Sequence, residues 1–317
     1  MKLIPNLPSR SKCRFLWTKG DYDGIIKNYE SNRLFRKLCI SGTRELDIIS
    51  IYLTALLNKK RLNDILKHKK DFDRLRESNL LPCYIELNKF AIDEKIVSPT
   101  HEMHKSYEAY QRIKNFKSIN FFWRNLCSEK FISIVGNAPI NYKCGDQIDS
   151  SDIVLRFNKF QTTGFSEFIG TKTDAWCRIC DIRLEGQHES YSHIKHVIFT
   201  DNPLNVPVGH QFINEVTTQE KNFYYIPQEI VEKMACMLNS IPSSGARILI
   251  SLHENTPHNK IKSQIYGFSF NNKQYNTDKF EHYFENKKEK ERAHNIKSEV
   301  QLLRKMFSEE GNTLLKF

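Results

Sequence analysis

The chain has 317 residues, of which 39% are hydrophobic and 12% aromatic. This composition supplies enough apolar side chains for one large packed domain or two, and it excludes an intrinsically disordered chain. Lysine and arginine outnumber aspartate and glutamate by 48 to 37, which gives a net charge of +11. The excess favours anionic partners such as a nucleotide, an acidic polysaccharide, a membrane surface or a nucleic acid, and charge alone does not choose among them.

The N-terminal residues indicate a protein that is not exported. Residues 1–17 contain no apolar segment of secretory length. The longest mostly apolar run, 46–57, is interrupted by polar residues and is too short to cross a bilayer. Eight cysteines lie scattered without the spacing of a disulfide framework, so we expect free thiols in a reducing compartment. The sequence therefore predicts a cytoplasmic protein.

Residues 1–125 are expected to form a helical domain. Apolar residues recur at helical spacing in 22–29, 46–57 and 62–66. The hairpin-like units lie about 40 residues apart, which suits tetratricopeptide-like repeats, and an irregular helical domain explains the pattern equally well. A basic cluster follows at Lys67, Lys69, Lys70, Arg74 and Arg76. Such a cluster is usually a solvated helix face, and here it is also a candidate surface for an anionic acceptor or a membrane.

From about residue 126 to 317, short apolar strands alternate with helical segments, which predicts a doubly wound α/β domain. Strands are expected at 131–135, 152–157, 196–200 and 223–226. Asn137 and Asn158 stand just past the carboxyl ends of the first two strands, at the sheet edge where open α/β folds bind nucleotides. Gly136, directly before Asn137, lets the backbone approach a ligand closely.

A helix is predicted to start shortly before residue 246. Ser243 and Ser244 precede the apolar run 246–252, and their hydroxyl groups can cap free backbone amides. The N-terminus of a helix presents unpaired N–H groups and a positive dipole, which suit a phosphate group. Taken by itself, this pattern is that of an ordinary capped helix.

The stretch from Phe131 to Arg178 carries a specific set of residues. They are Val135-Gly136-Asn137, Ile148-Asp149-Ser150, Asp152, Val154, Arg156, Asn158, Gly164-Phe165 and Ile169-Gly170-Thr171-Lys172-Thr173-Asp174. In type and spacing, these residues resemble the long sialyl motif of the eukaryotic-type sialyltransferases. So many matching positions are far more specific than a lone glycine motif.

Three further segments follow in the order of the same family. Pro242-Ser243-Ser244-Gly245, with Tyr266-Gly267-Phe268 some twenty residues later, resembles the short sialyl motif. His282-Tyr283-Phe284-Glu285 is similar to the third motif. His294 and Glu299 match the His-x4-Glu of the last motif. A lone histidine in a charged helix is usually a surface residue, but four signatures in family order favour a functional role for His294.

The resemblance covers roughly residues 131 to 317, and the tail from Glu299 onward is similar to the end of the α2,8-linking branch. It implies a Rossmann-like sialyltransferase catalytic domain of the α/β class, a GT-A-like variant, after the helical domain. It also implies an inverting glycosyltransferase that moves sialic acid from CMP-sialic acid to a glycan acceptor. The family uses no metal ion, and no other cofactor is implied.

The resemblance assigns roles to individual residues. His294 is implied as the base that takes the proton of the acceptor, and Glu299 as the group that holds the local backbone or the histidine. His282 is implied to bind the leaving phosphate, with Asn137 and Asn158 as neutral hydrogen-bond donors. The residues implied in binding the CMP-sugar are Gly136, Asn137, Asn158, Ser243, Ser244, Gly245 and Tyr283.

The chain departs from the animal members of the family in its cysteines. Ile132 stands where the long motif has a cysteine, and residues 242–270 contain none, so the disulfide between the first two motifs cannot form. Cys144 matches a second cysteine of the α2,8 branch, whose partner near the C-terminus is missing. These departures predict a cytosolic, bacterial enzyme of capsule or lipopolysaccharide synthesis. A lipid-linked acceptor and contact with the inner face of the cell membrane through the basic helical domain are candidate features.

Two alternatives stay open. CMP-Kdo shares the nucleotide, the anomeric carboxylate and the leaving group with CMP-sialic acid, so the nucleotide motifs do not separate a Kdo transferase from a sialyltransferase. A helical-repeat adaptor whose α/β part has lost activity is more remote, because His282, His294, Glu299, Asn137 and Asn158 are all present. No nucleic-acid partner is expected, since the basic residues are spread along the chain.

Overall fold

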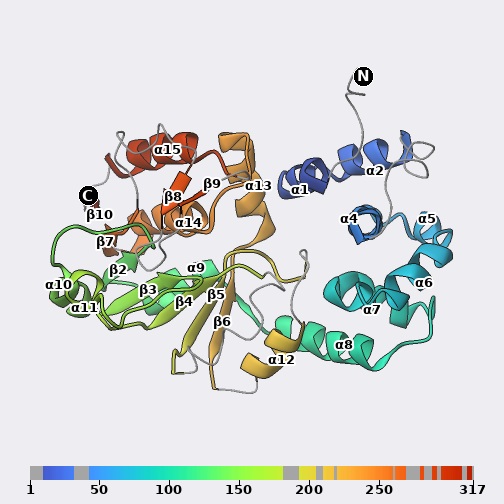
Figure 1. The fold of residues 1–317 in the computed structure, drawn as a ribbon, viewed down its shortest axis with the longest axis horizontal. Coiled ribbons are helices and arrows are strands. Elements are labelled where there is room, and N and C mark those ends of the chain that lie inside the picture. The colour runs from blue at the N-terminus through green and yellow to red at the C-terminus, as the bar shows by residue number, and fades with distance from the viewer. Residues whose placement is uncertain are drawn as a thin grey trace. The chain divides into compact units, whose positions relative to one another are not determined.

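The computed structural model describes residues 10–31, 43–180, 193–204, 210–217, 220–259, 261–268, 279–281, 288–290, 294–308 and 313–315. The chain forms two compact units (Figure 1). The first contains the described residues up to Asn115 together with later residues, among them 210–217, and the second begins at Phe116. The described elements of the first unit are helices, and the second unit is built on a parallel sheet. The α/β class predicted for the catalytic part is confirmed. A domain boundary near residue 125 and a tetratricopeptide-like repeat stay predictions.

The helical unit contains α1 (Arg10–Thr18), α2 (Tyr22–Ser31), α4 (Thr43–Asn58), α5 (Leu62–Leu66), α6 (Lys69–Glu77), the 3-10 turn η1 (Leu81–Cys83), α7 (Ile85–Asp93), α8 (His101–Ile113) and α12 (His210–Thr217). The apolar stripes expected at 22–29 and 46–57 form its core. Tyr29 of α2 stacks on Tyr52 of α4 with ring centroids 3.7 Å apart. Although α12 comes from a later part of the chain, it packs on α8, where Asn214 Nδ2 donates to the Lys105 carbonyl at 2.9 Å.

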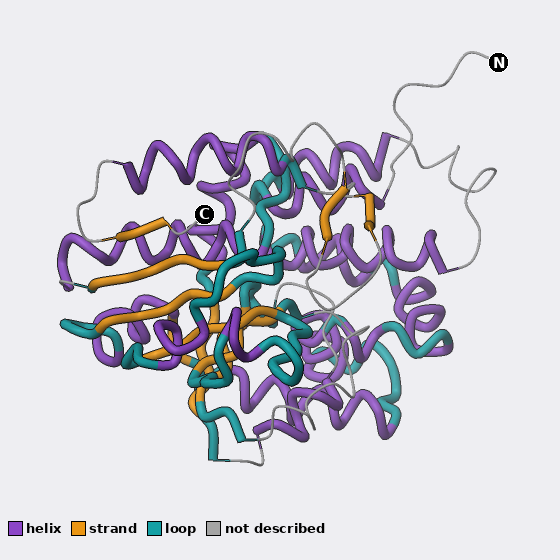
Figure 2. The backbone as a smooth tube through the Cα atoms, turned by 60° about the vertical axis from the view of Figure 1, so that its left-hand side comes forward, coloured by secondary structure: helices purple, strands orange, loops and turns teal. Residues whose placement is uncertain are grey.

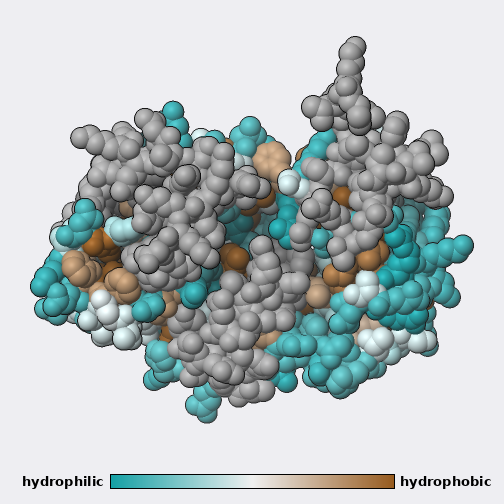
Figure 3. Space-filling view, in the orientation of Figure 1, coloured by the Kyte–Doolittle hydropathy of each residue, from teal (hydrophilic) through white to brown (hydrophobic). Residues whose placement is uncertain are grey.

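The basic cluster of this unit is partly neutralised by acidic neighbours. Lys67 pairs with Asp64 at 2.7 Å, and Arg74 pairs with Glu45 at 2.7 Å. Figure 3 shows hydrophilic residues over α5 and α6. Each exposed pair contributes little to stability in water. The cluster is therefore a solvated face, and its use as a docking surface stays a prediction.

The second unit contains an eight-stranded sheet with the order β1-β6-β5-β4-β3-β2-β7-β10. The strands are β1 (Lys117–Ser118), β2 (Phe131–Val135), β3 (Ile153–Phe157), β4 (Ala175–Arg178), β5 (His196–Phe199), β6 (Asn222–Tyr225), β7 (Lys262–Tyr266) and β10 (Thr313–Leu315). All neighbouring strands of this sheet pair in parallel. The four strands predicted from the sequence are confirmed. A separate antiparallel pair joins β8 (Lys279–Glu281) and β9 (Lys288–Lys290).

Helices cover both faces of the large sheet, as Figure 2 shows. They are α9 (Ile119–Phe121), the π-helical turn η2 (Phe122–Leu126), α10 (Gly145–Asp149), α11 (Ser166–Ile169), α13 (Gln228–Leu238), α14 (Ser244–Asn259) and α15 (Ile296–Ser308). Alternate residues of β3 face opposite sides. Ile153 and Leu155 join the core under η2, α13, α14 and α15, whereas Val154 joins a smaller core with α10 and α11. Both faces are buried, which explains the continuous apolar runs in the sequence.

The strand order creates a switch point between β2 and β7. The chain runs outward from β2 through β3, β4 and β5 to β6, and it then returns to place β7 on the other side of β2. In open α/β sheets, ligands bind outside the carboxyl ends of the strands at such a point. The described residues that follow β2 and β7 are therefore the first place to look for a site.

One half-buried histidine at the opposite end of the sheet should make stability depend on pH. His196 begins β5, its ring lies 6.1 Å from that of Tyr224, and its Nδ1 atom is buried with no hydrogen-bond partner among the described residues. Burial lowers the pKa of His196, and the nearby Asp174 carboxylate only partly opposes this. The unfolded chain then binds a proton more readily, so the free energy of unfolding should fall as pH drops through about 6.5.

Urea denaturation between pH 7.5 and 5.5 measures this effect. We expect His196→Phe to lose less stability over this range than the wild-type protein, because the group that takes up the proton on unfolding is gone. The matched change His193→Gln, at an exposed position, should leave the pH dependence as it is. Equal slopes for His196→Phe and wild type would remove His196 as the cause.

Candidate active site

Two glycines hold the carboxyl ends of β2 and β7 against each other at the switch point. The amide of Gly136 donates to the Tyr266 carbonyl at 2.8 Å, and the amide of Ala138 donates to the Gly267 carbonyl at 2.8 Å. A Cβ atom on Gly136 would lie 2.4 Å from the Gly267 oxygen, and one on Gly267 would lie 2.6 Å from the Gly136 oxygen. Gly267 also has a φ of +64°. Both positions therefore require glycine.

The ring of Phe268 lies against glycines from two of the sequence motifs. A Cβ atom on Gly245 would lie 2.6 Å from Cε1 of Phe268, and one on Gly136 would lie 2.9 Å from Cε2. Phe157, at the end of β3, meets the same ring edge-on with centroids 5.6 Å apart. The glycines thus bring β2, β7 and the start of α14 close together around one aromatic side chain.

Asn137 lies directly after β2, as predicted, and its side chain has one unsatisfied atom. Its Nδ2 donates to the carbonyls of Phe157 and Lys159 at 3.2 and 3.0 Å. Its Oδ1 is buried and has no hydrogen-bond partner in the described part of the chain. A buried acceptor without a donor costs free energy. The position therefore favours a ligand that brings a hydroxyl or amino group.

Asn158 shapes the turn after β3. Its φ is +44°, in the left-handed region that asparagine tolerates better than most residues. Its Oδ1 accepts from the amide of Ile179 at 3.1 Å, and its carbonyl accepts from Nε1 of Trp176 at 2.6 Å. Asn158 thus ties the end of β3 to the end of β4.

The N-terminus of α14 begins where the sequence predicts it. Ser243 Oγ accepts from the amide of Ala246 at 3.2 Å, which makes Ser243 the cap of this helix. Ser244 Oγ lies 3.1 Å from Oγ1 of Thr200, at the end of β5. The first turn of α14 contains no acidic residue, so its positive dipole has no carboxylate of its own.

Glu299 supplies that carboxylate from α15. Its Oε1 accepts from the amide of Ser243 at 2.8 Å, and its Oε2 accepts from Ser243 Oγ at 2.6 Å. The residue is only 4% exposed. Burial raises the pKa of Glu299, while the two bonds from Ser243 and the charges of His294 and Arg247 act in the opposite direction. Glu299 therefore holds the local backbone, one of the two roles expected for it.

His294 stands just before α15, which Asn295 caps by accepting from the amide of Ser298 at 3.2 Å. The Nδ1 atom of His294 lies 2.7 Å from the Ile241 carbonyl. A carbonyl only accepts hydrogen bonds, so Nδ1 carries the hydrogen and Nε2 carries the lone pair of the neutral ring. His294 and Glu299 therefore bind the same short segment, Ile241–Ser243.

Removing the carboxylate of Glu299 should destabilise the protein. In Glu299→Ala, the amide and hydroxyl of Ser243 lose their charged acceptor in a buried place, and we expect the free energy of unfolding to fall by about 3 kcal/mol. Glu299→Gln retains one acceptor oxygen and should lose about 1 kcal/mol. Urea denaturation at neutral pH measures both values. The same loss in the two variants would show that packing, and not these hydrogen bonds, sets the effect.

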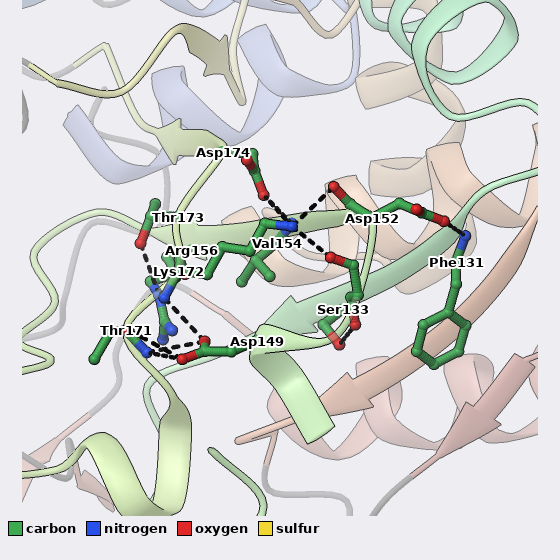
Figure 4. A network of polar contacts seen from close by, with 11 residues as sticks. Phe131, Ser133, Asp149, Asp152, Val154, Arg156, Thr171, Lys172, Thr173 and Asp174 are labelled. Atoms are coloured by element: carbon green, nitrogen blue, oxygen red, sulfur yellow. Dashed lines mark hydrogen bonds and ion pairs between the residues drawn. The ribbon is translucent and has the colours of Figure 1, made fainter. Parts of the chain in front are cut away.

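Several residues that carried the family resemblance stabilise the loops of the fold. Figure 4 shows the network that they form. Asp149 accepts from the amides of Thr171 and Lys172 at 2.9 Å. Asp174 accepts from the amide of Val154 at 2.8 Å, and Asp152 accepts from the amide of Phe131 at 2.8 Å. This part of the motif therefore fixes the ends of the strands.

Two of the expected site residues lie outside the described part of the chain, and other expectations concern metal sites, membrane spans and disulfides. The two residues are His282 and Tyr283, so their positions are not described. Among the described residues, no group of three histidine, cysteine, aspartate or glutamate side chains could hold a metal ion. No described helix is long and apolar enough to cross a membrane. The described cysteines are free thiols.

Sequence reasoning missed Thr200, Asp201 and Arg247, which surround the start of α14. Arg247 donates to the carbonyls of Pro242 and Thr200 at 3.0 and 2.8 Å, and it forms an ion pair with Asp201. The one available signal was a charged residue inside the apolar run 246–252.

A family model matches the part of the chain that carries the long motif and the start of the short motif, and its match ends before the third and last motifs. The model of glycosyltransferase family 29 (sialyltransferase) matches residues 86–263, more than half of the chain. Two solved structures of a mammalian sialyltransferase, one of them in complex with Gal-beta-1-3GalNAc-ortho-nitrophenol, are similar to the chain at 19 and 20% identity, with TM-scores of 0.47 and 0.46. Each likeness covers 69% of this chain and 80% of the other. No curated protein matches the sequence. On the strength of the family match, the chain belongs to glycosyltransferase family 29, the sialyltransferases, and is a CMP-sugar-dependent glycosyltransferase.

Proposed function

We propose that this enzyme moves sialic acid from CMP-sialic acid to a glycan acceptor with inversion at the anomeric carbon and without a metal ion. His294 is the base, and Glu299 stabilises the segment that orients it. The observation that supports this most is the convergence of both residues on Ile241–Ser243 at the N-terminus of α14. A histidine whose Nδ1 is bonded to a carbonyl presents a basic Nε2, as a general base requires.

The proposed reaction proceeds in one displacement. Nε2 of His294 takes the proton from the acceptor hydroxyl, and the oxygen of that hydroxyl forms a bond to the anomeric carbon of the sialic acid. The bond between this carbon and the phosphate oxygen breaks, and CMP leaves with the electron pair. The transition state resembles an oxocarbenium ion, as in other glycosyl transfers. A general base in such a step contributes about 100- to 10,000-fold to the rate.

The donor site is proposed at the switch point between β2 and β7. Glu299 takes the amide of Ser243 and Ser243 Oγ takes the amide of Ala246, so the amides of Ser244 and Gly245 are the ones proposed to meet the phosphate of CMP. The buried Oδ1 of Asn137 suits a hydroxyl or amino group of the nucleotide. His282, Tyr283, Asn158, Ser243 and Gly136 stay proposed donor-site residues on the strength of the family motifs. This arrangement places the leaving group near α14.

The acceptor is proposed to be a glycan of capsule or lipopolysaccharide, carried on a lipid and met in the cytoplasm at the inner face of the membrane. The net charge of +11 supports an anionic surface or acceptor. The basic cluster of α6 and its neighbours is the proposed contact with the membrane. CMP-Kdo is the alternative donor, since it differs from CMP-sialic acid only in the sugar.

A donor assay tests the proposal. The protein is incubated with CMP-sialic acid or CMP-Kdo in the presence of a chelator, and the release of CMP is followed with and without added glycan. Release from CMP-sialic acid alone supports the proposal, and release from CMP-Kdo alone replaces the donor. No release from either, together with no shift of the melting temperature by CMP, would contradict transferase activity and favour an inactive adaptor.

A further inference from the structure

Each residue of the segment Ile241–Ser243 is held by a different charged or titratable side chain. The carbonyl of Ile241 accepts from His294, and the amide of Ser243 donates to Glu299. Between them, the carbonyl of Pro242 accepts from Nε of Arg247 at 3.0 Å. Arg247 is not among the residues that carried the family resemblance. Its contact joins the segment to a residue one turn inside α14.

Arg247 is itself anchored at the end of β5. Its Nη1 donates to the Thr200 carbonyl at 2.8 Å and forms an ion pair with Asp201. Arg247 is only 6% exposed. Its neighbours along the helix, Ala246 and Ile248, are buried in the apolar core. The guanidinium group is thus a rigid bridge between the carboxyl edge of the sheet and the backbone of Pro242.

The charge of Arg247 is compensated by two carboxylates. Asp201 forms an ion pair with it, and Glu299, whose pKa the Arg247 charge lowers, lies at the same end of α14. Taking an ion pair out of water costs about as much as the pair gains, so the pair by itself is weak evidence for a role in stability. The geometry of the three acceptors of Arg247 indicates a second role, in holding the segment Ile241–Ser243.

The backbone transmits the position of Arg247 to His294. Arg247 and Glu299 hold the two polar atoms of the peptide group that joins Pro242 to Ser243. The ring of Pro242 locks its φ, so only one backbone torsion separates this peptide group from the one that contains the Ile241 carbonyl. That carbonyl in turn fixes the tautomer and the direction of the His294 ring.

We propose that Arg247 is a positioning residue for His294, acting through Pro242 and the Ile241 carbonyl, with Asp201 as its counter-ion. This inference rests on the proposed function of His294 as the base. A planar, five-donor guanidinium can bind two carbonyls and a carboxylate at once, whereas a lysine ammonium cannot reach all three in the same geometry. Arg247→Lys is therefore not a conservative change here.

The test uses protein labelled with nitrogen-15 in the histidine rings, because the ring nitrogen shifts report the tautomer without any catalysis. His294→Ala identifies the His294 signals. We expect the Nδ1–H tautomer in the wild-type protein and a mixture of tautomers in Arg247→Met, with Arg247→Lys in between. In the donor assay, Arg247→Met should lower kcat on the order of tenfold to a hundredfold with KM for the donor unchanged.

Two further variants test whether a change of tautomer comes from general destabilisation of the fold. Arg247→Met combined with Asp201→Asn leaves no unpaired buried charge, so it should fold and still show the mixed tautomers. Asn255→Leu removes a different buried polar side chain of α14, which donates to Ser251 O at 2.8 Å, and should keep the wild-type tautomer. A wild-type tautomer in both Arg247 variants would overturn the proposal, as would mixed tautomers in Asn255→Leu.

The outcome separates this inference from the proposed function. If the wild-type protein releases CMP from neither donor, the proposed transfer fails, and the ring signals still decide whether Arg247 controls His294. If CMP is released and Arg247→Met keeps both the tautomer and kcat, the transfer stands and the positioning role fails.

Discussion

Replacing His294 by alanine should lower the rate of CMP release in the presence of acceptor by about 100- to 10,000-fold. The variant loses the Nε2 lone pair that takes the proton from the acceptor hydroxyl in the proposed reaction. KM for the CMP-sugar should change little, because the base contacts the acceptor and not the donor. Steady-state kinetics at saturating acceptor measures both parameters.

A structural cause for such a loss must be separated from a chemical one. His294→Ala removes one hydrogen bond to the Ile241 carbonyl and should cost about 1 kcal/mol in the free energy of unfolding. CMP should therefore still raise the melting temperature of the variant. His193→Ala, at an exposed position, is the matched control and should keep the wild-type rate. A His294→Ala variant that is active within tenfold of wild type would move the base to another residue.

Replacing Gly267 by alanine should destabilise the protein by about 2–5 kcal/mol. The new Cβ would lie 2.6 Å from the Gly136 carbonyl oxygen, which belongs to a neighbouring strand end and cannot move away cheaply. The φ of +64° adds the strain of a left-handed conformation, about 1–2 kcal/mol. The same shift should weaken CMP binding, because it forces β2 and β7 apart at the switch point.

Gly164 is the matched control for this change. It also has a positive φ, +84°, but a Cβ atom there would meet nothing within 4 Å. Gly164→Ala should therefore cost only about 1–2 kcal/mol from the backbone conformation, and CMP should raise its melting temperature as in wild type. Urea denaturation and thermal shift with CMP compare the two variants. Equal losses would mean that strain alone, and not the contact between the two strand ends, determines the need for glycine.

The sequence by itself determined four strands of the described eight-stranded sheet and much of the edge where the candidate site lies. Continuous apolar runs such as 131–135 form strands because both of their faces are buried, and that requirement is local and readable. The turn after a parallel strand lies at a known edge of the sheet, so Gly136 and Asn137 could be placed there without a structure. The serines before residue 246 likewise predicted the start of α14.

The roles of single residues within the motifs were less readable. Asp149, Asp152 and Asp174 carried the resemblance as strongly as Asn137 did, yet they bind backbone amides of neighbouring loops. A sequence pattern records that a residue type is required and does not record whether a ligand or the fold requires it. The hydrogen-bond partners make that distinction.

Only the tertiary structure showed which residues His294 and Glu299 contact. Their spacing in the sequence does not place them on one helix face, and the contacts that matter join residues 53 and 56 positions apart, to Ile241 and Ser243. These distances are set by the packing of α14 and α15 on the same face of the sheet, through residues such as Leu249 and Leu303. The contacts of Arg247 could not be predicted for the same reason. The sequence shows only a charged residue within an apolar run, and its acceptors at the end of β5 are distant in the sequence.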